Sequence, residues 1–203
     1  MMKEYNINQT TLKILALYRN NYKASMHLRE IARETNVDVK AIQLQLKKLE
    51  KTNITTSTMK GKNKEYSLNL NNYTAKYYIT LAETFTTINY LSKNYEIKKL
   101  ITETENQLGN STILFGSYAR EETTEESDID LLIITDTKPD TNAIKEAGKL
   151  INREINVKFT TEEQFQNGLM NNDPLIREVI ANHIILKGID NICNIMWRHH
   201  ARH

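Results

Sequence analysis

The feature that most constrains this fold is the run DIDLLII, Asp128 to Ile134, in which two acidic residues lead into four consecutive apolar ones. Because side chains alternate between the two faces of a strand, Asp128 and Asp130 point to one side while Ile129 and Leu131 point to the other. The apolar residues that follow predict a strand buried on both faces. The chain must therefore form a covered sheet that holds two carboxylates close together.

The segment around this run alternates between strands and helices, which favours an α+β domain with a mixed β-sheet packed with helices over residues 109–190. Apolar runs predict strands over residues 111–116, 128–136, 154–160 and 183–188. Helices are predicted to begin at Ser117, Thr141 and Glu162, and at Pro174 after an Asp173 cap.

The first seventy residues have a different pattern, three helical segments followed by a hairpin. Helical spacing predicts helices over residues 10–20, 26–36 and 39–53, the third capped by Asp38. An apolar stripe marks that third helix: Val39, Ile42, Leu46 and Leu49. The alternating segments that follow predict two strands joined at Gly61.

Charge separates the two parts of the chain. Residues 1–70 contain thirteen Lys and Arg against six Asp and Glu, whereas the remainder contains fourteen against nineteen. A basic first part and an acidic second part indicate two units with different partners.

The N-terminal pattern resembles a winged helix-turn-helix domain over residues 1–71, which implies contact with DNA. The candidate DNA-binding residues are Lys40, Gln43 and Lys47 on the exposed face of the third helix, and Lys60, Lys62 and Lys64 at the hairpin tip. The alternative is a solvated lysine-rich helix with a hairpin used for protein contacts.

The remaining segments predict less about function. The spacing of apolar residues over 72–108 predicts a connecting helix or helix pair. Five apolar positions are expected to form either core or the seam of a homodimer: Tyr78, Leu81, Phe85, Ile88 and Leu91. Residues 191–203 are expected to be a mobile basic tail.

The single cysteine, Cys193, excludes an internal disulfide, and no apolar run approaches the roughly 18 residues of a membrane span. We expect a cytoplasmic protein without a membrane anchor.

The residues before the acidic pair are suited to phosphate. Gly116 lets the chain turn sharply at the end of a strand, so that Ser117 opens a helix whose first N–H groups are free. Such N–H groups attract anions, and Arg120 on the same turn adds positive charge. The two aspartates provide the hard oxygen ligands that Mg²⁺ prefers. This spacing predicts a site for a nucleoside triphosphate and its metal ion.

These residues together resemble the signature of minimal nucleotidyltransferases in the DNA polymerase beta superfamily: Gly116-Ser117, ten residues, then Asp128-Ile129-Asp130. The resemblance implies two magnesium ions, a nucleoside triphosphate such as ATP, and transfer of its nucleotidyl group to a hydroxyl with release of pyrophosphate. It assigns phosphate binding to Gly116 and Ser117 and metal binding to Asp128 and Asp130.

The sequence departs from that family at two places. Members carry a third catalytic aspartate on the next strand, where this chain has Asn156, with Glu154 as a candidate substitute and Lys158 opposing cation binding. Glu121 stands where the family commonly has glycine.

Two hypotheses follow. The first is a magnesium-dependent nucleotidyltransferase acting on a protein or small-molecule hydroxyl, coupled to a DNA-binding domain. The second is a transcription regulator whose C-terminal domain senses nucleotide with little or no catalysis.

Overall fold

The computed structural model describes residues 7–202, which divide into two compact units. One unit comprises the chain up to Phe85 together with the residues from Met196 onward, and the other comprises Thr86–Ile195. The break at Phe85 falls inside the segment that the sequence predicts to be connecting, and residues 1–6 and 203 of the predicted N-terminal domain and tail lie outside the described residues.

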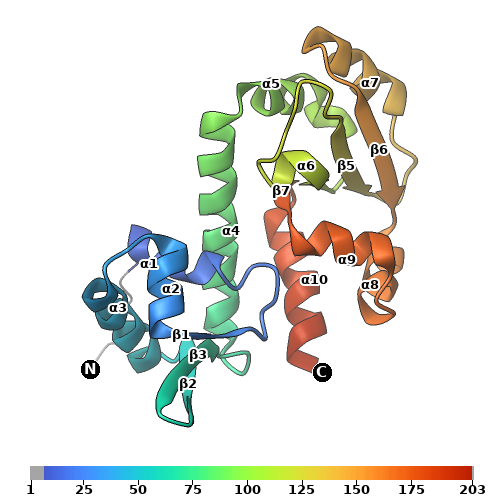
Figure 1. Cartoon of the computed structure of the whole chain (residues 1–203). Helices are drawn as coiled ribbons and strands as arrows, with labels where there is room; N and C mark the ends of the chain where they lie inside the picture. Colours follow the sequence, from blue (N-terminus) through green and yellow to red (C-terminus); the bar gives the residue numbers. More distant parts are fainter. Residues whose placement is uncertain (1–6, 203) are drawn as a thin grey trace. The chain divides into compact units, whose positions relative to one another are not determined.

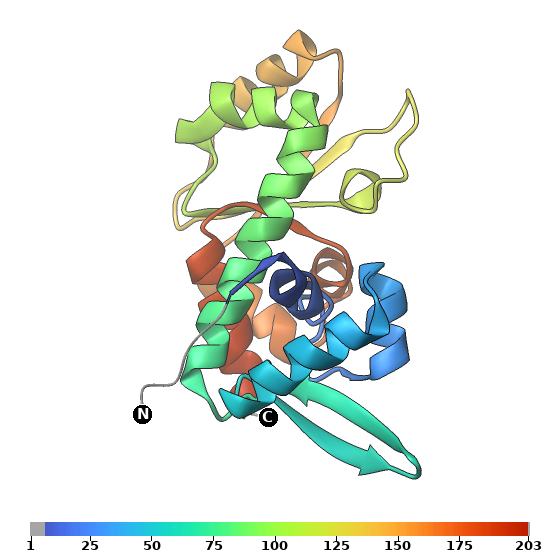
Figure 2. The same cartoon turned by 90° about the vertical axis from the view of Figure 1, so that its left-hand side faces the viewer.

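The N-terminal unit contains the predicted order of helices and hairpin, with one short strand added (Figure 1). Its elements are α1 (Gln9–Ala16), β1 (Ser25–His27), α2 (Leu28–Thr35), α3 (Val39–Lys51), β2 (Thr55–Lys60) and β3 (Asn63–Leu68). The strands form an antiparallel sheet in the order β1-β3-β2. Figure 2 shows the β2–β3 hairpin extending beyond α3, with the turn at Gly61 held at φ +63°.

Helix α3 begins as predicted, because the Asp38 side chain accepts hydrogen bonds from the N–H groups of Lys40 and Ala41. Its buried residues are Ile42, Gln45, Leu46 and Leu49. The prediction that Val39 belongs to the apolar stripe is wrong, since its side chain is 40% exposed. Val39 is the first residue of the helix, and a terminal turn need not pack against the core.

Helix α4 (Tyr73–Lys93) is followed by α5 (Tyr95–Thr104) and a short 3₁₀ turn, η1 (Glu105–Gln107). Of the predicted apolar positions, Leu81 and Ile88 are 41% and 62% exposed and lie outside the core, whereas Tyr78 is buried. The buried apolar residues of the helix are Ala75, Tyr78, Ile79, Ala82 and Tyr90. The alanines on this face let the helix pack closely.

The second unit is built on a four-stranded mixed sheet, as an α+β fold requires. Its elements after η1 are β4 (Ser111–Phe115), α6 (Gly116–Ala119), β5 (Ile129–Ile134), α7 (Thr141–Leu150), β6 (Ile155–Thr160), α8 (Glu162–Met170), α9 (Pro174–Ala181) and β7 (Ile184–Lys187). The strand order is β6-β5-β4-β7, with β5 and β6 parallel and the other pairs antiparallel.

The two faces of this sheet have different roles. One face packs into an apolar cluster with residues of α5 and α7: Ile97, Leu100, Ile129, Leu131, Ile144 and Ile155 are among its members. The opposite face carries Asp130 and, further along β5, Leu132, which faces α8 and α9. The alternation predicted for the DIDLLII run therefore determines which face is core and which bears polar groups.

The C-terminal segment corrects the expectation of a mobile tail. Residues Ile189–Arg202 form helix α10, and its apolar side chains are buried: Ile192, Cys193, Ile195, Met196 and Trp197. Trp197 and His200 lie against the Tyr22 ring, with ring centroids 6.1 and 5.1 Å away. The helical spacing of these apolar residues gives the segment a packed face, so His199 and His200 are held on a fixed element.

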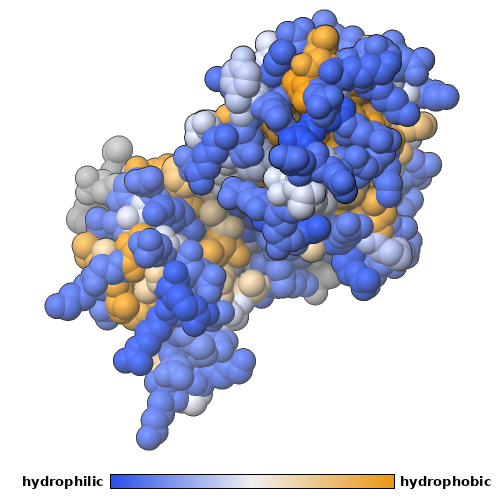
Figure 3. Space-filling model, turned by 45° about the horizontal axis from the view of Figure 1, so that its top comes forward, coloured by the Kyte–Doolittle hydropathy of each residue, from blue (hydrophilic) through white to orange (hydrophobic). Residues whose placement is uncertain are grey.

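A search of residues 7–202 for helices able to span a lipid bilayer finds no candidate. The surface seen in Figure 3 is largely hydrophilic, and its hydrophobic residues form separate small patches.

Candidate functional site

The carboxylates of Asp128 and Asp130 lie at the start of β5, on the polar face of the sheet. Both residues are half-buried. Burial raises the pKa of Asp130, and the nearby charge of Asp128 adds to that effect. A divalent cation beside the pair would remove this cost, because it favours the ionised form of both groups.

Gly116 lies directly against this pair, because Phe115 is paired with Asp130 in the register of β4 and β5. The backbone of Gly116 has φ +72°, and a Cβ atom there would overlap Oδ2 of Asp130 and lie 3.2 Å from its Cγ. Only glycine combines this backbone conformation with such a close approach. The structure thus brings the glycine-serine turn and the acidic pair together, as the sequence predicts.

The turn that follows is short. Helix α6 has four residues, with Ser117 in its first turn and Arg120 at its C-terminal cap. A helix of one turn has a small dipole, so anion binding here would depend on the N–H groups of the turn itself. The Arg120 side chain contacts Glu122, with Nε 2.9 Å from the carboxylate, and this ion pair competes with the predicted phosphate contact.

The acidic loop after this turn faces solvent. All residues from Glu121 to Glu126 are exposed. Glu121 has φ +57°, in the left-handed region that favours glycine, which explains why the resemblance puts glycine at this position. Arg153 braces the loop, because its guanidinium donates to the carbonyl of Glu125 and pairs with Glu96 at 3.1 Å. Arg153 therefore fixes the part of the loop at Glu125, whereas the backbone N–H of Glu122 donates to the Ser117 carbonyl and stays next to the glycine turn.

The neighbouring strand β6 places a carboxamide beside the acidic pair. Asn156 is level with Asp130 in the parallel register, and its Nδ2 donates to Asp128 Oδ2 at 3.2 Å and to Asp130 Oδ1 at 3.4 Å. Glu154 precedes the strand, is exposed, and contacts β5 through its backbone carbonyl, which accepts from Ile129 N–H at 2.9 Å. The structure does not bring Glu154 into the group, because Asn156 occupies the position next to both aspartates.

The two carboxylates are hard donors that fit one magnesium ion, whereas Asn156 presents its N–H₂ group to them rather than its oxygen. Within residues 7–202, no three His, Cys, Asp or Glu side chains come together as a metal site. The residues present therefore fit a single ion better than the two that the resemblance implies.

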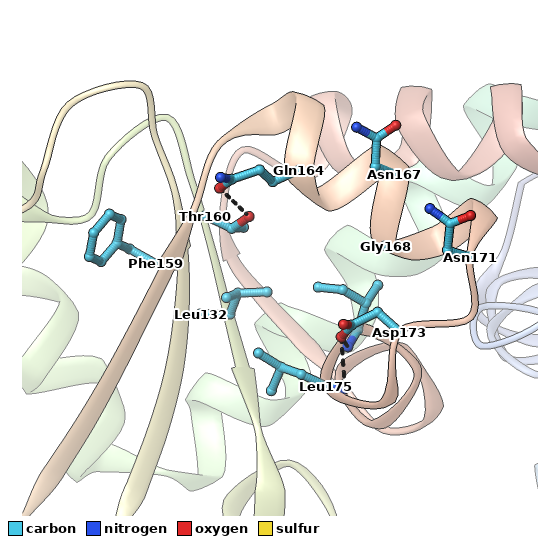
Figure 4. Close-up of a pocket in the computed structure, with 10 residues that line it drawn as sticks. Leu132, Phe159, Thr160, Gln164, Asn167, Gly168, Asn171, Asp173 and Leu175 are labelled. Atoms are coloured by element: carbon cyan, nitrogen blue, oxygen red, sulfur yellow. Dashed lines mark hydrogen bonds between the residues drawn. The ribbon is translucent and has the colours of Figure 1, made fainter.

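A pocket of about 350 Å³ lies on the same face of the sheet, between the ends of β5 and β6 and the α8–α9 pair (Figure 4). Its polar side chains are mostly uncharged, and Gln164, Asn167 and Asn171 all come from one face of α8 and its C-terminal cap. Leu132, two residues beyond Asp130 on β5, forms part of its apolar lining. Sequence reasoning missed this pocket, although carboxamides at positions i, i+3 and i+7 share a helix face.

The candidate DNA-binding residues of the N-terminal unit divide into two groups. Lys40, Gln43 and Lys47 are exposed on α3, and Lys62 is exposed at the hairpin tip. Lys60 and Lys64 are exposed as well, but each is engaged in an ion pair, with Glu65 at 3.3 Å and with Glu50 at 2.9 Å. These glutamates reduce the charge that the hairpin presents.

Residues 96–187 match the family model described as "Nucleotidyltransferase domain". The chain is also 44% identical to a protein of Methanocaldococcus jannaschii named "Putative protein adenylyltransferase". That alignment covers 23% of this chain and 63% of the relative, so the chain spans less than two thirds of the relative's length. No solved structure gives a significant match.

Proposed function

We propose that the chain is a magnesium-dependent nucleotidyltransferase that binds a nucleoside triphosphate, ATP by preference, and transfers its nucleotidyl group to a hydroxyl. The observation that carries this proposal is the close approach of Gly116 to Asp130, which puts a turn suited to phosphate beside a ligand suited to a metal ion. ATP and a protein acceptor are favoured because the relative from Methanocaldococcus jannaschii is named as a protein adenylyltransferase.

The reaction would proceed by in-line displacement. The acceptor oxygen bonds to the α-phosphorus, the bond from that phosphorus to the pyrophosphate oxygen breaks, and the hydroxyl proton leaves to solvent or base. Magnesium held by Asp128 and Asp130 would neutralise phosphate charge. Gly116 and Ser117 would bind the leaving phosphates, since the glycine leaves the backbone accessible and the serine adds a hydroxyl donor.

The carboxamide pocket is the candidate site for the acceptor. Gly116 follows β4, on one side of the acidic pair, whereas Phe159 and Thr160 of the pocket lie on β6, on the other side. In-line transfer requires the attacking and leaving oxygens to be on opposite sides of the phosphorus. Carboxamides and apolar groups suit an uncharged acceptor, such as a peptide segment that carries a hydroxyl.

For the N-terminal unit we propose a winged helix domain that binds DNA. Support comes from three helices followed by a β-hairpin, and from the exposed polar face of α3 that carries Lys40, Gln43 and Lys47. The Lys60 and Lys64 ion pairs make the hairpin a weaker contact than the helix.

A homodimer is proposed through α4, whose exposed face carries Tyr73, Tyr77 and Leu81, at 60%, 51% and 41% exposure. Side chains at this spacing form one stripe on a helix. A second copy would cover it and align two DNA-binding helices with paired half-sites.

The second candidate function is a transcription regulator whose nucleotidyltransferase domain senses nucleotide without transferring it. The observation that favours it is Asn156, which supplies neither charge nor a catalytic base beside Asp128 and Asp130.

A transfer assay distinguishes the two functions. Purified protein is incubated with magnesium, ATP labelled at the α-phosphate and cell extract, and pyrophosphate release and label transfer are both measured. Asp128→Asn and Asp130→Asn should abolish both signals, whereas Asp140→Asn, which alters only the cap of α7, should not. Nucleotide binding that needs Asp130, without pyrophosphate release, would establish the sensor instead.

DNA binding is tested separately by electrophoretic mobility shift at low and high salt. Lys40→Ala combined with Lys47→Ala should weaken DNA binding. The slope of log affinity against log salt concentration should become shallower by about two, because two phosphate contacts are lost. Lys98→Ala and Lys145→Ala, which remove two exposed lysines of the other unit, provide the control. An unaltered shift in the α3 variant would refute this part of the proposal.

A further inference from the structure

The site has two acidic residues and one carboxamide, where the resemblance implies three acidic residues. Asn156 is level with Asp130 on β6 and donates hydrogen bonds to both aspartates. A carboxamide brings no negative charge, so the protein supplies two carboxylates rather than three to the cations that accompany a bound triphosphate. With one protein counter-charge fewer, the repulsion between two divalent ions a few ångströms apart is less well compensated.

Lys158 adds a positive charge to this face. It is two residues beyond Asn156 on β6, so it points to the same side of the sheet, and it is level with Leu132 on β5. Its Nζ lies 6.0 Å from the centroid of the Phe115 ring. Phe115 belongs to β4, on the far side of β5, and is paired with Asp130. The lysine side chain therefore reaches across β5, and its ammonium group lies near the acidic pair rather than out at the sheet edge.

We propose that Lys158 is a catalytic residue that supplies a fixed positive charge to the reacting phosphate in place of a second metal ion, so that the site works with one divalent ion. The inference rests on the proposed nucleotidyl transfer. The ammonium can donate to a non-bridging oxygen of an α-phosphate bound beside the acidic pair. The charge that a second ion would bring is then provided by the chain itself, and Asn156 avoids the excess negative charge of a third acid.

Manganese titration tests this directly, with binding as the readout rather than turnover. Free Mn²⁺ is measured by electron paramagnetic resonance in the presence of wild-type protein and α,β-methylene-ATP, which cannot be cleaved at the reacting bond. Wild type should bind one Mn²⁺ per bound analogue. Lys158→Ala should bind the analogue about tenfold more weakly, because a charge-assisted contact is lost, and Lys158→Arg should keep most of the affinity.

The double variant Asn156→Asp, Lys158→Ala restores three acids and removes the ammonium, and it should bind two Mn²⁺ per analogue. Lys145→Ala, an exposed lysine on α7 at the other face of the sheet, should behave as wild type. Two Mn²⁺ ions in the wild-type complex, or unchanged affinity in Lys158→Ala, would overturn the inference while leaving nucleotidyl transfer intact. Failure of wild type to bind the analogue with Mn²⁺ would overturn the proposed function itself and this inference with it.

Discussion

Replacing Gly116 with alanine tests the contact on which the proposed site depends. At φ +72° an alanine is strained by about 1–2 kcal/mol. Its Cβ would also overlap Oδ2 of Asp130, whose strand is fixed between β4 and β6. The carboxylate must then rotate away and lose its hydrogen bond from Asn156, which costs about 1 kcal/mol more. The expected destabilisation is about 2–3 kcal/mol, or a fall in Tm of about 5–10 °C for a chain of this size.

Gly61→Ala is the matched control, because Gly61 has φ +63° and no atom lies within 4 Å of the Cβ position. The Gly61→Ala variant has the same backbone strain without the overlap, so its free energy of unfolding should fall by only about 1–2 kcal/mol. Calorimetry measures the Tm of both variants against wild type. Gly116→Ala should also bind Mn²⁺ more weakly because Asp130 is displaced, whereas Gly61→Ala should not.

The reasoning would be refuted by a Gly116→Ala variant that is destabilised no more than Gly61→Ala and binds Mn²⁺ like wild type. Such a result would mean that Asp130 does not lie against the glycine turn.

Three further outcomes are expected. Burial lowers the pKa of His200 to about 4, so the unfolded chain takes up this proton at a higher pH than the folded chain, and stability should fall as the pH drops from about 6.5 to about 4. His200→Gln should lessen the loss of Tm between pH 7 and pH 5, and an unchanged loss would contradict this. Tyr77→Asp should convert a dimer to a monomer in light scattering, whereas Tyr95→Asp on α5 should not; a monomeric wild type would end the dimer proposal. Asn167→Arg with Asn171→Arg should abolish transfer to the acceptor but keep nucleotide binding, and retained transfer would exclude the pocket as acceptor site.

The local periodicity of the sequence predicts much of this structure. The cap at Asp38, the strand after Asp128 and the placement of both aspartates on one sheet face all depend on residues within a few positions of each other. The approach of Gly116 to Asp130 follows from the pairing of β4 with β5, which are consecutive strands joined by residues 116–128.

Other features depended on pairing between distant residues. The register of β5 with β6 places Asn156 rather than Glu154 beside the aspartates, and the width of one strand lets Lys158 reach the ring of Phe115. The exposed positions of α4 and the packed helix α10 were likewise decided by their neighbours. Periodicity specifies which residues share a face, because it follows from backbone geometry. Which of those residues meet across strands and helices is specified by packing, and only the tertiary structure determines that.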